Sequence, residues 1–300
     1  MLGVTILGNN SAIPAHDRHP TAQILTLHNE LILIDCGEGT QVQIAKYKIK
    51  YNKINHIFIS HLHGDHYFGL IGLITSWGLM NRDHDLHLYA PPLLKNIIDL
   101  QLTAASTSLP YNLIFHPLGS NGIIADEANF TVESFSTKHR IPCWGFIFRE
   151  KKRPRRLNLK EALKYNIAES MYANLQKGED VFNRAGELIK NAAVTTSNTA
   201  AKSYVFCGDT KYDESLIDIV KNTQLMYHET TYLKNLNEKA TMRFHSTTEQ
   251  AATLAAKAGV QQLIIGHFSS NYSNLDEFVT ESRAVFPNTH LALEGLTFRL

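Results

Sequence analysis

The chain has 300 residues, of which 44% are hydrophobic and 19% charged, and its formal net charge at pH 7 is +1. A nearly neutral chain is unlike proteins that coat nucleic acid through bulk basicity, so any contact with nucleic acid must be a local patch. No stretch approaches the roughly 18 apolar residues that a membrane span requires.

The first third of the chain alternates β-rich runs with helical patterns. Four short runs bounded by Gly, Asn or Asp predict strands at 4–7, 22–27, 31–34 and 56–59. Apolar residues at helical spacing predict a helix over 65–79, and two prolines suited to a first helical turn open another over 91–102. A strand over 86–89 separates these helices. This rhythm is typical of an α/β fold.

The second half repeats the rhythm after an interruption. From 149 to about 190 the sequence becomes polar, basic and weakly helical, which predicts an insertion. A last helix and strand pair is predicted near the C-terminus, and no repeat of 20–50 residues is visible. The remaining predicted elements are strands at 130–135, 144–148, 204–207, 225–227 and 263–265 and a helix at about 247–258.

The cysteines are three in number, widely separated and without a CxxC pair. This spacing favours buried thiols in a reducing compartment over a disulfide framework, so we predict a cytoplasmic protein. The residues are Cys36, Cys143 and Cys207.

The run His61-Leu62-His63-Gly64-Asp65-His66 is the strongest chemical signal. Four candidate ligands in six residues require a loop, because neighbouring side chains of a straight strand point to opposite faces. The glycine at 64 permits such a turn. Imidazoles suit zinc, and Asp65 with His66 indicates a second metal position. A lone histidine is usually a core side chain, but this grouping favours a metal site.

Two metals need more ligands than one loop supplies. His139, Asp209 and His267 each follow the end of a predicted strand, where the strand fixes position and the loop frees the side chain. Glycines precede the last two. Taken singly, each of these three residues is as easily a turn residue as a ligand.

His245 is a candidate acid or base. Ser246 and Glu249 match a capping box, which would place His245 just before a helix as a rigidly held side chain. Glu229 is a candidate partner. The alternatives are a histidine that packs on its own helix and a glutamate that makes a structural hydrogen bond.

A basic stretch inside the predicted insertion is the strong charge cluster of this nearly neutral chain. Such runs are often solvated surface, but several Lys and Arg residues could also neutralise RNA phosphates without reading bases. The candidate RNA-binding residues are Arg149, Lys151, Lys152, Arg153, Arg155 and Arg156.

HLHGDH, a later lone histidine, CGDT and a strand-terminal histidine together resemble the metallo-β-lactamase superfamily over nearly the whole chain. The resemblance implies one metallo-β-lactamase-fold domain, a four-layer αββα sandwich. It also implies two zinc ions per subunit. One would be bound by His61, His63 and His139, the other by Asp65, His66 and His267, with Asp209 bridging both.

Further motifs resemble the ribonuclease Z branch, which trims the 3′ end of precursor tRNA. They are Pro14 to His19, the box His228-Glu229-Thr230-Thr231 and the run Phe244-His245-Ser246-Thr247. This chain departs from the family at His16 and His19, at Asn271 where arginine is usual, and at 168–172, where the glycine-proline element of the family's arm is absent.

The ribonuclease Z resemblance implies a zinc-dependent endoribonuclease that pairs as a homodimer and grips tRNA with an inserted basic arm at about 149–190. Asp65 would orient the attacking water or accept its proton, His245 would protonate the departing 3′ oxygen, and Glu229 would support His245. Two alternatives stay open. One is a metal hydrolase of the same fold acting on a small phosphodiester, an arylsulfate or a lactone, and the other is a non-catalytic RNA-binding or scaffold protein.

Overall fold

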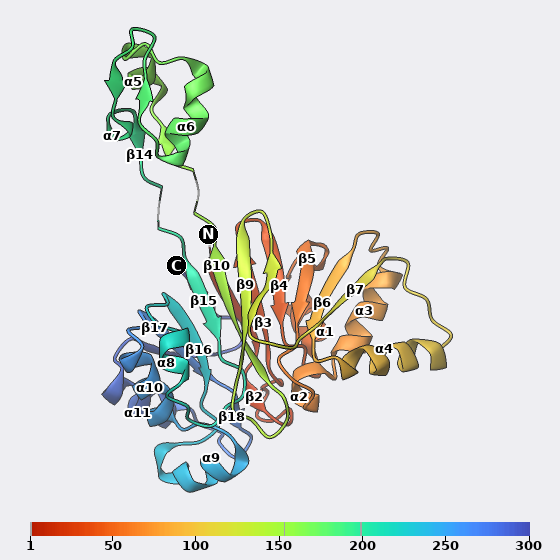
Figure 1. Ribbon diagram of the computed structural model, residues 1–300. Coiled ribbons are helices and arrows are strands. Elements are labelled where there is room, and N and C mark those ends of the chain that lie inside the picture. The colour runs from red at the N-terminus through yellow and green to blue at the C-terminus, as the bar shows by residue number, and fades with distance from the viewer. Residues whose placement is uncertain (1, 153, 199) are drawn as a thin grey trace. The chain divides into compact units, whose positions relative to one another are not determined.

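The computed structural model describes residues 2–152, 154–198 and 200–300 (Figure 1). The chain divides into two compact units, one of Met1–Arg149 with Lys202–Leu300 and one of Glu150–Ala201. The insertion was predicted at 149 to about 190, so the second unit begins one residue later and ends eleven residues later.

The first unit contains two seven-stranded sheets. In the first sheet the order is β20-β1-β3-β4-β5-β6-β7, and the strands β4 to β7 run parallel to one another. The strands are β1 (Leu2–Gly8), β3 (Ala22–Leu27), β4 (Glu30–Ile34), β5 (Ile54–Phe58), β6 (Leu86–Ala90), β7 (Leu113–Pro117) and β20 (Thr297–Arg299).

The second sheet has the order β19-β17-β16-β15-β10-β9-β8, with β15, β16, β17 and β19 parallel. A short strand pair, β2 (Asn10–Ser11) with β18 (Phe268–Ser269), links the N-terminal part of the chain to this half. The strands are β8 (Gly122–Asp126), β9 (Phe130–Ser136), β10 (Trp144–Glu150), β15 (Ser203–Phe206), β16 (Leu225–Glu229), β17 (Gln262–Gly266) and β19 (Thr289–Leu291).

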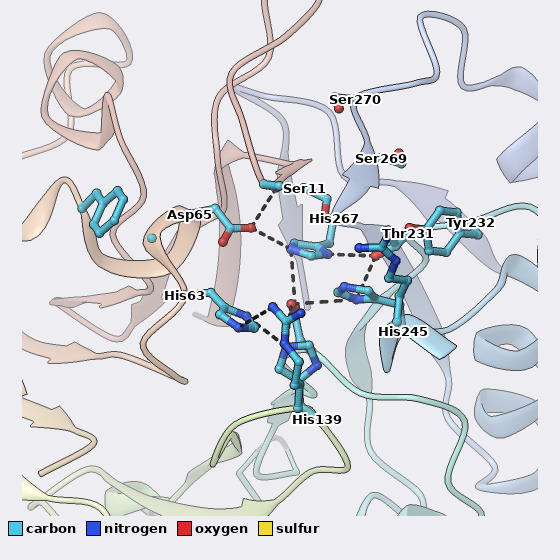
Figure 2. A pocket seen from close by; sticks show the side chains of 16 residues that line it. Ser11, His63, Asp65, His139, Thr231, Tyr232, His245, His267, Ser269 and Ser270 are labelled. Carbon is cyan, nitrogen blue, oxygen red and sulfur yellow. Dashed lines mark hydrogen bonds and ion pairs between the residues drawn. The ribbon is translucent and has the colours of Figure 1, made fainter. Parts of the chain in front are cut away.

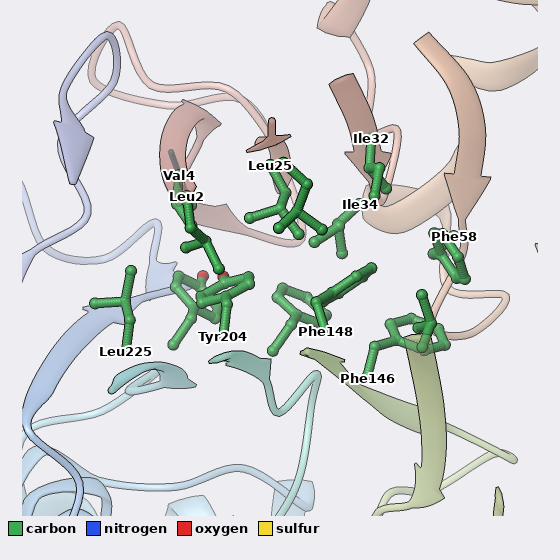
Figure 3. Close-up of a cluster of buried hydrophobic side chains, with 14 of the residues drawn as sticks. Leu2, Val4, Leu25, Ile32, Ile34, Phe58, Phe146, Phe148, Tyr204 and Leu225 are labelled. Atoms are coloured by element: carbon green, nitrogen blue, oxygen red, sulfur yellow. The ribbon is translucent and has the colours of Figure 1, made fainter. Parts of the chain in front are cut away.

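Three apolar clusters define four layers, as predicted. Phe58, Phe146, Phe148 and Tyr204 belong to a core shared by the two sheets (Figure 3). A second cluster joins the first sheet to its helices, and a third joins the second sheet to its own. The helices are α1 (Thr40–Lys46), α3 (Leu70–Leu79) and α4 (Leu93–Ala104) on the first sheet, and α8 (Leu216–Ile219), α10 (Thr248–Lys257) and α11 (Asp276–Val285) on the second.

Shorter helices connect these layers. They are α2 (Gly64–Tyr67), α9 (Asn237–Arg243) and the 3₁₀ turns η1 (Tyr51–Lys53) and η3 (Lys234–Leu236). The three cysteines are free thiols and buried. Among the residues that the structure describes, no helix is long and apolar enough to cross a membrane.

The single helix predicted over 65–79 was wrong, because it breaks between α2 and α3. The backbone N–H of Gly69 leaves the helix and donates to the carbonyl oxygen of Cys36 at 2.9 Å. A Cβ at position 69 would lie 2.2 Å from the carbonyl oxygen of Gly37, so only glycine allows this approach. The tertiary contact therefore ends α2 just after the residues that carry the site.

The capping box of α10 was also predicted one residue too early. Thr247 caps the helix by accepting from the backbone N–H of Gln250, and the Gln250 side chain accepts from the N–H of Thr247. Ser246 instead donates its hydroxyl to the carbonyl oxygen of Thr210 at 2.7 Å. His245 thus lies two residues before the cap.

The second unit has a small core of its own, with Leu175 and Val194 at its centre. Its hairpin strands β12 (Val181–Phe182) and β13 (Leu188–Ile189) pair antiparallel, as do β11 (Arg156–Leu157) and β14 (Thr195–Thr196). The remaining elements are α5 (Leu159–Lys164), η2 (Glu169–Met171), α6 (Tyr172–Lys177) and α7 (Asn191–Val194). Residues 168–172 therefore lead through η2 into α6.

A histidine group lies on three neighbouring strands of the first sheet. His56 is 5% exposed, and its ring centroid is 5.1 Å from that of His87. Nδ1 of His87 lies 2.9 Å from Nε2 of His116, whose ring stacks on Tyr89. Burial and the neighbouring His87 and His116 lower the pKa of His56 from 6.5 to about 4.

This pKa predicts a stability that falls in mild acid. Below pH 6.5 the unfolded chain binds a proton at His56 that the folded chain does not bind until pH 4, so folding loses free energy as the pH falls through this window. When the pH is lowered from 7 to 5, the unfolding free energy of the metal-free wild-type protein should fall. This fall should be about 2 kcal/mol larger than the fall measured for metal-free His56→Gln. Urea unfolding of both proteins checks this, and equal losses would contradict it.

Candidate dinuclear metal centre

The loop after β5 delivers His61 and His63, and the first turn of α2 carries Asp65 and His66. Gly64 has a role different from the one expected. It opens α2, and a Cβ there would lie 2.1 Å from Cε2 of Phe68, so a larger residue at this position would displace the exposed Phe68 ring.

A first group of donors gathers around Nδ1 of His63. Nε2 of His61 and Nε2 of His139 each lie 3.0 Å from that atom. Oδ2 of Asp209 is 3.7 Å from Nε2 of His61. Burial and neighbouring imidazoles lower the pKa of His61 and that of His63, the latter to about 4. These rings are therefore neutral near pH 7 and carry the lone pairs that a metal needs.

A second group forms around Oδ2 of Asp65. Nε2 of His267 is 3.3 Å and Nε2 of His66 is 3.6 Å from that oxygen. Asp209 faces this group too, with Oδ1 at 3.5 Å from Nε2 of His267 and Oδ2 at 3.5 Å from Nε2 of His66. All seven side chains named from the sequence are thus brought together, and Asp209 stands between the two groups.

Backbone geometry explains how Asp209 and His267 reach the centre. Gly208 has a φ of +62°, and His267 itself has a φ of +60° at the end of β17. Such left-handed residues turn the chain sharply where each strand ends. A Cβ on Gly266 would lie 2.5 Å from the hydroxyl oxygen of Tyr227, so this glycine permits close packing.

The chemistry of the site fits bound cations. Within the described residues, the ligand atoms of each group lie within 4.8 Å of one another, and those of Asp209, His245 and His267 do so as well. Nε2 of His66 is buried and faces the cluster, and no hydrogen-bond partner for it lies among the residues that the structure describes. Burial would lower the pKa of His66, but Asp209, Asp65 and Asp35 raise it well above its usual value. These carboxylates therefore draw positive charge into the buried site.

Asp35 is a supporting residue that sequence reasoning missed. Its Oδ2 lies 2.7 Å from Nδ1 of His66, and its Oδ1 accepts the backbone N–H of Ser60 at 2.8 Å. The fully buried carboxylate thereby directs Nε2 of His66 toward the cluster, as carboxylates behind metal-binding histidines do. In the sequence, Asp35 could have been identified as a candidate because it directly follows the strand at 30–34.

Three other histidines are held through Nδ1 in the same way. Nδ1 of His139 donates to the carbonyl oxygen of Phe244 at 3.0 Å, and Nδ1 of His61 is 3.0 Å from the hydroxyl of Ser60. Nδ1 of His267 is 3.0 Å from the hydroxyl of Thr231. For each ring the opposite nitrogen faces the centre, so the tautomers suit metal binding.

His245 pairs with Glu229 at the end of β16. Nδ1 of His245 donates to Oε1 of Glu229 at 2.8 Å, and the hydroxyl of Thr231 donates to Oε2 at 2.7 Å. Burial would lower the pKa of His245, but Glu229 and then Asp209 raise it to about 9. His245 therefore carries a proton at neutral pH. His228 does not belong to this pair, because its Nδ1 donates to the backbone carbonyl oxygen of Glu229 and not to the Glu229 carboxylate.

The N-terminal loop joins the segment after His267. Arg18 donates to the side chain of Asn10 at 3.0 Å and to the carbonyl oxygen of Tyr272. Nε2 of His16 lies 2.9 Å from the carbonyl oxygen of Ser270. His19 pairs with Glu294, and the exposed Asn271 follows on the other segment. These contacts brace the rim of the site.

The predicted RNA-binding residues divide between the two units. Arg149 lies in β10 of the first unit, which corrects its placement in the insertion. Lys151, Lys152, Arg155 and Arg156 belong to the second unit, and Arg153 lies outside the described residues.

The centre opens into a cavity of about 420 Å³ (Figure 2). His63 and Asp65 stand on one side of it and Tyr232 and His245 on the other. Two arginines, Arg140 and Arg243, also line the cavity. A polar cavity with two groups of ligands and an adjacent protonated histidine can hydrolyse a phosphodiester.

Comparisons with known proteins agree with this chemistry. Ribonuclease Z of Bacteroides fragilis (strain YCH46) is 37% identical over 297 residues, which is 98% of each chain. That of Prochlorococcus marinus (strain NATL2A) is 38% identical and covers 98% of this chain and 97% of its own. The family model described as anti-Pycsar protein Apyc1 matches residues 2–152.

Solved structures have the same fold. The crystal structure of human tRNase Z, short form, superposes with a TM-score of 0.72 and 25% identity, covering 99% of this chain and 98% of that one. A metallo-beta-lactamase fold protein from Bacillus subtilis has a TM-score of 0.70, 17% identity and full coverage of both chains.

Fold and site together define a metal-dependent hydrolase of the metallo-β-lactamase fold. Within this class the chain belongs to the ribonuclease Z family, and its residues 2–152 also belong to the family of the Apyc1 model.

Asp35→Asn should weaken metal binding while leaving the fold intact. Asn tolerates the left-handed φ of +55° at this position, but an amide holds the Nδ1 proton of His66 less strongly than a carboxylate does. Loss of such an outer partner costs about 10- to 100-fold in metal affinity. Competition with a chelator measures it, and an unchanged zinc affinity would remove Asp35 from the site.

Proposed function

We propose that the chain is the endoribonuclease that removes the 3′ trailer from precursor tRNA and leaves a 3′-hydroxyl on the tRNA. The observation that carries the proposal is the seven-residue His and Asp centre with the protonated His245 beside it, in a chain of the ribonuclease Z family. Such a centre suits phosphodiester hydrolysis, and membership of the family names the substrate.

We propose two zinc ions per subunit as the cofactor. His61, His63 and His139 would hold one, and Asp65, His66 and His267 the other, with Asp209 shared. The imidazole-rich donor set suits zinc better than magnesium or calcium, which prefer oxygen ligands. Bound cations of this kind ionise a water near neutral pH and stabilise negative charge on phosphoryl oxygens.

The protein's own groups handle the protons and the orientation. Oδ2 of Asp65 accepts the backbone N–H of Ala12 at 2.9 Å, which fixes the carboxylate beside the place of attack, where it orients the attacking water or accepts its proton. On the other side, the Nδ1–H of His245 is held by Glu229, so Nε2–H is the proton available to the departing 3′ oxygen.

We also propose that the second unit binds the tRNA through its basic residues. Lys152, Arg155 and Lys177 line one hollow of this unit. Arg155 donates to the hydroxyls of Thr195 and Ser197, and these neutral partners leave its positive charge available to phosphate. Contacts of this kind neutralise phosphates without reading bases, so affinity should fall with salt.

Homodimer formation and a cytoplasmic location are two further proposals from the family resemblance. The exposed apolar side chains Leu93 and Leu100 of α4 offer surface that a subunit contact could bury.

A defined precursor tests the proposed function. The zinc-replete protein should cut a tRNA precursor that carries a 3′ trailer and yield tRNA with a 3′-hydroxyl and a trailer with a 5′-phosphate, because the departing atom is the 3′ oxygen. End mapping of both products measures this. Asp209→Ala is the matched control, since it should lose metal as well as activity. An intact precursor alongside cleavage of bis(p-nitrophenyl) phosphate would favour a small-substrate hydrolase.

His245→Ala separates proton donation from metal binding. We expect full zinc content, because His245 is outside the two groups that gather around His63 and Asp65, and a fall in kcat of about 10²- to 10⁴-fold, the usual contribution of a general acid. Elemental analysis and single-turnover cleavage provide the two measurements. An unchanged rate in the metal-replete variant would exclude His245 from the reaction.

A further inference from the structure

Phe68 is an exposed aromatic residue at the wall of the catalytic cavity. Its side chain lines the cavity together with Gly64 and Asp65, yet it is 64% exposed. The residue follows α2 directly, one turn after Asp65, and its backbone N–H donates to the carbonyl oxygen of Gly64 at 2.9 Å. A large apolar ring is therefore fixed to the same short element that carries two of the metal-ligand candidates.

The Phe68 ring lies against Gly64. A Cβ at position 64 would lie 2.1 Å from Cε2, 2.5 Å from Cζ and 2.6 Å from Cδ2 of Phe68, so the ring packs directly against the glycine. The ring thus lies against Gly64 along one edge, while the residue as a whole is mostly exposed and lines both the catalytic cavity and a smaller hollow beside Leu70 and Leu94. An anchored and open aromatic ring loses little conformational entropy when a flat partner stacks on it.

The opposite wall is built from different residues. Tyr232 is buried, its ring meets that of His245 edge-on at 6.3 Å, and Lys239 lies over its face. Figure 2 shows Tyr232 and His245 across the cavity from His63 and Asp65. An RNA strand bound at the centre therefore has two distinct sides, one toward Phe68 and one toward His245.

The chemistry decides which nucleotide lies on which side. His245 protonates the departing 3′ oxygen, and this oxygen belongs to the last nucleotide of the tRNA. That nucleotide must then lie on the side of His245 and Tyr232. The first nucleotide of the trailer is joined to the same phosphorus through its 5′ oxygen. It therefore lies on the opposite side of the cavity, toward Phe68.

We propose that the ring of Phe68 stacks on the base of the first trailer nucleotide. Stacking on an aromatic ring accepts any base, because every base has a π face, so it suits a trailer of variable sequence. Arg140 supports this placement, since its NH2 lies 3.3 Å from Nε2 of His63 on the same wall and brings positive charge to the trailer phosphates. The inference rests on the proposed function and assigns a subsite of the same centre.

A precursor whose first trailer nucleotide is abasic tests this contact directly. On the normal precursor, Phe68→Ala should lower kcat/KM by about 5- to 100-fold, the range expected for one lost base-aromatic stack. On the abasic precursor the wild-type protein should fall to the level of the variant, and Phe68→Ala should show no further loss. Phe68→Trp should keep its rate on the normal precursor and lose it on the abasic one.

Leu79→Ala is the matched control, because Leu79 is 86% exposed at the end of α3 and does not line the cavity. It should behave as the wild type on both precursors. An equal loss for Phe68→Ala on both precursors, or no loss on either, would overturn the proposal. A changed mass in light scattering with equal losses would place the ring at a subunit contact and overturn it as well.

The same assay separates the two levels of inference. If the zinc-replete wild-type protein leaves the normal precursor uncut, the proposed function and the stacking site both fall. If it cuts that precursor but Phe68→Ala loses the same factor relative to the wild type on both precursors, or loses nothing on either, only the stacking site falls.

Discussion

The buried carboxylate of Asp209 is the constraint on which the rest of the structure depends. It lies within 4 Å of ring nitrogens from His61, His66 and His267, which come from two different sheets. A buried carboxylate is costly unless it is paired with positive charge. Cations bound on either side would supply that charge, so folding of the two halves against each other and metal binding are parts of one equilibrium.

The sandwich serves this constraint by bringing strand ends from both sheets to one edge. The loop after β5 comes from the first sheet, while the residues after β15, β16 and β17 come from the second. The rigid core between the sheets holds these loops at fixed separation. Behind the ligands, Asp35 and Thr231 fix the histidine rings, so precision at the centre is built from side chains that would not touch a metal themselves.

The ligand candidates could be proposed from the sequence more readily than the residues that support them. HxHxDH is informative because its donors are close along the chain, whereas Asp35 is a single aspartate after a strand and resembles a turn residue until His66 is placed beside it. The capping box was ambiguous by one residue, since Ser246 and Thr247 can both cap. The contact of Ser246 with Thr210 decided between them, and only tertiary structure contains it. The edge strands β7 and β8 were missed because they are partly exposed and weakly patterned.

The left-handed residue Phe244 connects two tasks that are usually considered apart. Its carbonyl oxygen accepts a hydrogen bond from His139, a ligand candidate, and the next residue along the chain is His245, the proposed proton donor. In the proposed reaction, one backbone turn would therefore position groups on both the attacking and the departing sides. A variant that relaxed this turn would disturb both sides together, so the chain cannot adjust its leaving-group chemistry here without also altering its grip on metal.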